Sequence, residues 1–149
     1  MMALAGCGLS PVYGTNGQAN ILRDAVSFSA PDTVAGFRLR DRLEERLGRA
    51  TAPKFALDVQ LGRTLTPAII ALDGDTTRFN LVGTANWVLR SAAGSSLTSG
   101  QVETFTSYSA TGSTVATEAA ATDAAARLFV ALADLIVSRL ILAAPGLPK

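Results

Sequence analysis

The sequence lacks histidine altogether and contains a single cysteine, Cys7. Serine and cysteine hydrolases usually rely on histidine as the general base, and zinc sites draw mostly on histidine and cysteine ligands. A lone cysteine also excludes a disulfide within the chain. These absences count against an enzyme and against a metal site, and we expect a binding or assembly module that needs no cofactor.

Charge is sparse as well. Charged residues make up 17% of the 149 residues and the formal net charge is +1, whereas nucleic-acid-binding domains normally carry a basic patch. Apolar residues account for 48% of the chain, which suffices for one well-packed core in a domain of this length. We therefore expect a single domain and no nucleic-acid partner.

The N-terminus contains a short motif around the cysteine. Leu4-Ala5-Gly6-Cys7 is similar to the lipobox of bacterial lipoproteins, in which small residues precede a lipidated cysteine. The resemblance implies cleavage before Cys7 and a diacylglyceryl group on its sulfur, and two or more acyl chains make a stable membrane anchor. Because a secretory signal needs a longer apolar segment, we interpret residues 1–6 as the remnant of a signal peptide.

Elsewhere the sequence predicts no membrane span. The most apolar stretch, Leu128 to Ala144, contains Asp134 and Arg139 and is shorter than the roughly 20 apolar residues that a span requires. The expected organisation is a lipidated terminus and tether over 7–24, one domain over 25–144 and a short tail over 145–149.

Hydrophobic periodicity predicts the elements of this domain. Residues 25–30 alternate as a short strand, and a helix follows, capped by Asp32 or Thr33 and ended by Gly48. Period-two patterns predict strands from Lys54, from Phe79 and over Val102 to Tyr108. The expected turns between them are Asp73-Gly74-Asp75 and Ala93-Gly94-Ser95-Ser96. We do not interpret the two aspartates of the first turn as a calcium site. A long helix is expected over 117–142.

The order is therefore β-α-β-β-β-α. Strands with one apolar face favour an antiparallel meander whose apolar side is covered by both helices. The predicted fold is an α+β two-layer sandwich, a four-stranded mostly antiparallel sheet with two helices on one face.

Taken together, these features resemble the LPS-assembly lipoprotein (LptE) family. The resemblance rests on Gly6-Cys7-Gly8-Leu9-Ser10-Pro11-Val12-Tyr13-Gly14, on the β-α-β-β-β-α order, and on the passage from Phe105-Thr106-Ser107-Tyr108 into a long Ala-rich helix. It implies an outer-membrane, periplasm-facing lipoprotein that sits as a plug inside a β-barrel translocon (an LptD-like protein) and assists delivery of lipopolysaccharide to the cell surface. Gly8, where aspartate would favour retention in the inner membrane, is consistent with outer-membrane sorting.

Two alternatives remain open at this point. One is an auxiliary lipoprotein of an ABC-type lipid transport system, which would share the lipobox and a small α+β domain. The other is a lipid-anchored enzyme, which the missing histidine disfavours.

Arginines are the natural candidates for contact with lipopolysaccharide, whose phosphates and acidic sugars suit guanidinium groups. Arg63, Arg78 and Arg90 lie on or beside the predicted strands and are the candidate contacts, although ordinary solvated arginines would give the same pattern. The arginines of the first helix are expected to form pairs within that helix, namely Arg38–Asp41, Arg42–Glu45 and Glu45–Arg49.

Overall fold

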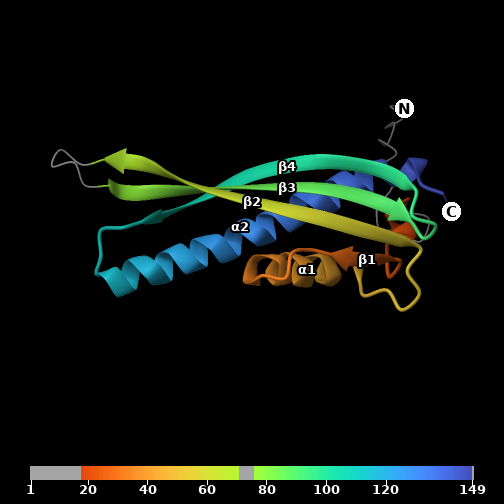
Figure 1. Cartoon of the computed structure of the whole chain (residues 1–149), viewed down its shortest axis with the longest axis horizontal. Helices are drawn as coiled ribbons and strands as arrows, with labels where there is room; N and C mark the ends of the chain where they lie inside the picture. The colour runs from red at the N-terminus through yellow and green to blue at the C-terminus, as the bar shows by residue number, and fades with distance from the viewer. Residues whose placement is uncertain (1–17, 71–75, 149) are drawn as a thin grey trace, which may run out of the picture.

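The computed structural model describes residues 18–70 and 76–148, and its arrangement is drawn in Figure 1. Cys7 and the predicted turn at Asp73–Asp75 lie outside the described residues. The elements follow the predicted order β-α-β-β-β-α, with a short 3-10 helix at each end. They are η1 (Gln18–Ile21), β1 (Val26–Ser29), α1 (Val34–Leu47), β2 (Phe55–Ile70), β3 (Thr76–Ser91), β4 (Ser96–Ser109), α2 (Thr114–Ala143) and η2 (Ala144–Gly146).

The four strands form one mixed sheet in the order β1-β2-β3-β4. β2, β3 and β4 are an antiparallel meander, as predicted, whereas β1 runs parallel to β2 with Val26 opposite Phe55. The parallel pair arises because α1 connects β1 to β2 and returns the chain to the end of the sheet from which β1 started. β1 pairs only with residues 55–58 of β2, so the predicted fold class is confirmed with one short parallel edge.

Local sequence signals set the limits of α1. The Thr33 side chain accepts a hydrogen bond from the backbone N–H of Gly36 at 3.1 Å, so the cap is Thr33 of the two residues expected. Gly48 ends the helix with a φ of 83°, a conformation that L side chains rarely adopt. Leu39, Leu43 and Leu47 are buried along one stripe, as their spacing predicts.

α2 runs along most of the length of the sheet, whereas the shorter α1 lies beside a smaller part of it (Figure 1). We expected no segment long enough to span a membrane. Thr114–Gly146 is nevertheless long and apolar enough to do so, with a mean hydropathy of 2.0 over its most apolar window. The Ala-rich residues before Leu128 extend the helix beyond the predicted apolar stretch. Because 44% of that window is buried within the protein, we interpret α2 as a core helix.

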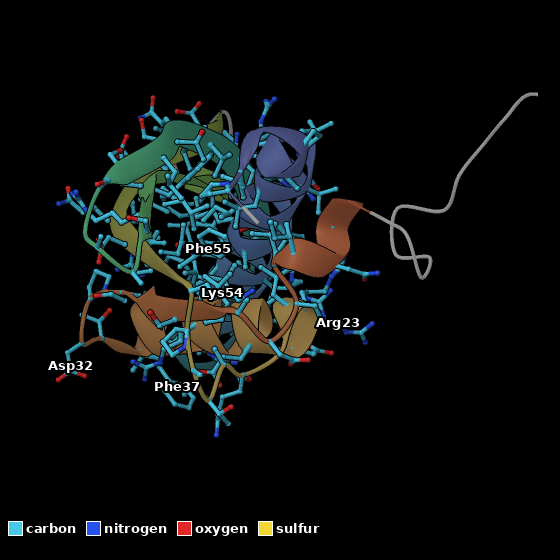
Figure 2. The ribbon with its side chains drawn as sticks, turned by 90° about the vertical axis from the view of Figure 1, so that its right-hand side faces the viewer. Arg23, Asp32, Phe37, Lys54 and Phe55 are labelled. Atoms are coloured by element: carbon cyan, nitrogen blue, oxygen red, sulfur yellow. The ribbon has the colours of Figure 1, made fainter. Side chains whose placement is uncertain are left out.

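The core lies between the sheet and the two helices. Leu57 and Leu89 of the sheet and Leu128, Leu132 and Ile136 of α2 are fully buried there. Figure 2 shows Phe55 among the side chains between the layers, whereas Phe37 points outward from α1. Both helices therefore cover the same face of the sheet.

The packed region extends beyond the domain limits that we expected, residues 25 and 144. Ala19 and Leu22, assigned to the tether, are 1% and 0% exposed, and Leu147 of the expected tail is also buried. η1 contacts η2, so the first and last described segments lie together at the C-terminal end of α2. The sequence did not predict this packing, because the two segments are too short to show a hydrophobic periodicity.

Candidate functional site

The face of the sheet that is turned away from the helices is covered by no other element of the described residues. A Cβ added to Gly83 would meet Leu128 and Leu132 of α2, so odd-numbered residues of β3 face the helices and even-numbered ones face away. The paired registers extend this assignment to β2 and β4. We call this surface the open face; its polar members include Asp58, Gln60, Thr64, Thr66, Arg78, Asn80, Thr84, Asn86, Arg90, Ser99, Gln101, Glu103 and Ser107.

Uncharged hydrogen-bonding groups dominate the open face. Ser107 donates a hydrogen bond to the amide oxygen of Asn80 across the β3–β4 pair at 2.7 Å. Asn80, Thr84, Asn86 and Arg90, which share one parity along β3, all lie on this face. The surface can therefore offer hydrogen bonds along three strands of 14 to 16 residues without presenting a strong field of one sign.

An exposed aromatic side chain stands out on this polar surface. Phe105 of β4 lies directly opposite Val82 of β3 and is 62% exposed. Exposed aromatic residues surrounded by polar groups are typical anchors of protein–protein interfaces. Phe105 alternates in register with Glu103 and Ser107, so the pattern of β4 places it on the polar face, but that pattern is too weak in the sequence to have singled it out.

Near the end of β1 the open face is hollowed. Asp58, Gln60, Asn86 and Arg90 line a broad depression of about 720 Å³. The Nε of Arg90 lies 3.2 Å from a carboxylate oxygen of Asp58, and both side chains are nearly half exposed. Arg90 is thus partly neutralised by its neighbour.

The three candidate arginines do not form one cluster. Arg78 and Arg90 share the open face but stand twelve residues apart on β3, a separation of about 40 Å along a strand. Arg63 is on the opposite face, where it lines a hollow between α1 and α2 together with Arg38. The structure therefore offers three separate cationic positions.

The arginines of α1 differ in part from the predicted pairing. Arg42 pairs with Glu45 at 2.7 Å, as expected. Arg49 pairs with Glu44 instead of Glu45. The expected Arg38–Asp41 pair is not among the ion pairs of the described residues. Arg42 also donates two hydrogen bonds of 3.1 Å to Asp134 of α2. The hydrogen bond to Asp134 is the main reason that the pKa of Arg42 is raised above its ordinary value, and Glu45 adds to it.

Asp134 is therefore the ionic link between the two helices. Arg46 also lies 3.6 Å from its carboxylate. The sequence shows Asp134 as a charge within the apolar stretch of α2, but it does not show the partners of Asp134 on α1, because these depend on how the helices pack. Within residues 18–70 and 76–148 no group of three acidic, histidine or cysteine residues is placed to hold a metal ion.

Comparison with known proteins gives a consistent result. The LptE family model, described as lipopolysaccharide-assembly, matches residues 24–140. No curated protein sequence matches the chain.

Several solved structures share the fold. A lipoprotein from Caulobacter crescentus CB15 is 20% identical with a TM-score of 0.71 and covers 88% of this chain and 100% of its own. Rare lipoprotein B from Shewanella oneidensis is 12% identical (TM-score 0.62; 78% and 92% covered). A minor lipoprotein from Acinetobacter baumannii is 15% identical (TM-score 0.58; 80% and 91% covered). These similarities show the fold, and the family match over most of the chain shows that it belongs to the LptE lipopolysaccharide-assembly family.

Proposed function

We propose that this protein is an outer-membrane lipoprotein, anchored through Cys7 and facing the periplasm, that assembles with and plugs a β-barrel lipopolysaccharide translocon and assists lipopolysaccharide delivery to the cell surface. Family membership supports the role in lipopolysaccharide assembly. The lipobox-like Leu4-Ala5-Gly6-Cys7 supports the anchor. The role is one of contact and assembly, without a chemical reaction.

The observation that carries this proposal is the open face. The interior of an outer-membrane β-barrel is polar, so a domain seated in it needs neutral hydrogen-bonding groups and few unpaired charges. The open face supplies Asn, Gln, Ser and Thr side chains along three long strands, and Arg90 is paired with Asp58. We assign this face to the barrel wall, with Phe105 and Val82 as its apolar anchor.

Lipopolysaccharide contact is assigned to the arginines that retain free hydrogen-bonding capacity. Arg63 and Arg78 are exposed and form none of the ion pairs found in the described part of the chain. Arg90 remains a candidate, but Asp58 competes with a phosphate for its guanidinium. We therefore expect Arg63, which lies on the other face of the sheet, and Arg78, which lies near the end of the open face remote from Arg90, to contribute more than Arg90.

Two similarly exposed phenylalanines provide the test. Phe105 is 62% exposed on the open face and Phe37 is 59% exposed on α1, in the other layer. Affinity purification of the tagged protein from envelope extracts should recover a large outer-membrane β-barrel. Phe105→Ala should reduce that recovery several-fold, because an interface anchor typically contributes more than about 1 kcal/mol, whereas Phe37→Ala should leave it unchanged.

The same purification also tests the alternative function, an auxiliary lipoprotein of an ABC-type lipid transport system. Recovery of components of an ABC-type lipid transporter without any β-barrel would contradict the proposed function. Equal loss of the barrel in both phenylalanine variants would contradict the assignment of the open face.

A further inference from the structure

A second hollow, between the helices, is chemically unlike the open face. It has a volume of about 360 Å³, at the small end of ligand sites. We call it the helix groove. Its apolar lining comes from both helices, namely Val34, Ala35, Ala121, Ala125, Ala126 and Phe129.

The groove exists because of the residues that the helices present to each other. Ala35, Ala121 and Ala125 leave space where larger side chains would close the contact. Phe129 is 4% exposed and connects the groove to the core. Val34 remains 76% exposed at the first turn of α1, so the apolar surface continues out of the groove to the solvent.

Two cations line this apolar surface from different elements. Arg38 comes from α1 and Arg63 from β2, and neither takes part in an ion pair within the described residues. Glu118 is the only carboxylate in the described lining, so the groove keeps a net charge of +1 from its ionised side chains. Guanidinium groups bind phosphate through paired, charge-assisted hydrogen bonds, which makes two free arginines beside an apolar cleft complementary to an anionic amphiphile.

We propose that the helix groove binds one acyl chain of a phosphorylated lipid whose phosphate is held by Arg38 and Arg63. The assignment of lipopolysaccharide as the natural lipid rests on the proposed function. The same chemistry is offered by an anionic phospholipid such as phosphatidylglycerol. The groove is too small for a membrane surface and suits a single chain withdrawn from one.

The test uses the full chain carrying Cys7→Ser, so that its own acyl chains do not compete. Short-chain phosphatidylglycerol and short-chain phosphatidylcholine, both below their micellar concentrations, are titrated in while NMR signals of Ala121 and Ala125 are followed. Phosphatidylglycerol should bind at one site and shift both alanines, and phosphatidylcholine should bind at least tenfold more weakly. Deep-rough lipopolysaccharide should then displace phosphatidylglycerol.

Variants separate the head from the chain. Arg38→Gln and Arg63→Gln should each weaken phosphatidylglycerol binding about tenfold, equivalent to about 1.4 kcal/mol. Arg139→Gln, an exposed arginine of α2 outside the groove, is the matched control and should change the affinity less than twofold. Ala121→Phe should fill the groove and abolish binding, with circular dichroism confirming that the fold is retained.

Unchanged affinity in both arginine variants, or equal binding of phosphatidylcholine, would overturn the phosphate assignment. Binding that persists in folded Ala121→Phe would overturn the groove as the chain site. If lipopolysaccharide fails to displace phosphatidylglycerol, the lipopolysaccharide assignment is wrong. Co-purification of the β-barrel is a separate readout. If the wild-type protein does not recover a β-barrel, the proposed function is contradicted. The groove assignment is decided by lipid binding alone.

Discussion

Gly83 offers the sharpest test of how α2 packs on the sheet. A Cβ at this position of β3 would lie 2.8 Å from Leu128 Cδ2 and 3.0 Å from Leu132 Cδ1, whereas carbon atoms prefer separations of about 3.5–4.0 Å. Gly83→Ala therefore requires α2 or both leucines to move, and overpacking of this kind costs about 1–3 kcal/mol. Replacing a strand glycine by alanine returns about 0.5–1 kcal/mol through chain entropy. We expect a net loss of about 1–2 kcal/mol in the free energy of unfolding.

Gly62 provides a matched control in the neighbouring strand. A Cβ there would point to the open face and meet Thr84 alone, at a side-chain oxygen that can rotate away. Gly62→Ala should therefore be neutral or slightly stabilising. Urea unfolding followed by circular dichroism measures the free energy of unfolding of both variants. In a thermal melt, each kcal/mol corresponds to about 2–4 °C in melting temperature for a chain of this size. If Gly83→Ala proves as stable as Gly62→Ala, the close contact between α2 and β3 is wrong.

Two further predictions concern the link between the helices and the anchor. Asp134→Ala removes the shared partner of Arg42 and Arg46 and should be about 0.5–1 kcal/mol less stable than Asp123→Ala, whose exposed pair with Arg127 contributes little. Both changes replace Asp by Ala inside α2, so the gain in helix propensity is the same in the two variants. Equal midpoints of urea unfolding would contradict the bridging role of Asp134. Cys7→Ser should leave the circular dichroism spectrum unchanged and release the protein from membranes on cell fractionation. A variant that stays with the outer membrane would indicate that the barrel retains it without lipid.

Much of the fold follows from local sequence patterns. The spacing of Leu39, Leu43 and Leu47 predicts the buried stripe of α1, because a helix places every fourth residue on one side. The alternation of Phe55, Leu57 and Val59 likewise predicts the buried face of β2. In both cases the neighbouring layer covers these residues, so periodicity and burial agree.

The pattern fails where the covering layer ends. Leu65 continues the same alternation on β2 but is 48% exposed, because burial of the distal part of the strand depends on how far the helices extend over it. Arg63, two residues earlier, is on the same face and becomes part of the helix groove. The sequence identifies Arg63 as a candidate contact, but its companion Arg38 and the Asp134 bridge depend on helix packing, which periodicity does not specify.

The central claim is that the open face meets the wall of a β-barrel. The most direct measurement is photo-crosslinking in intact cells from a reactive residue placed at Asn86, which is exposed in the middle of that face. The account predicts an adduct with a large outer-membrane β-barrel protein, retained in Phe37→Ala and reduced in Phe105→Ala. Adducts only with an ABC-type transport component, or no barrel adduct from Asn86 or from other open-face positions, would contradict it.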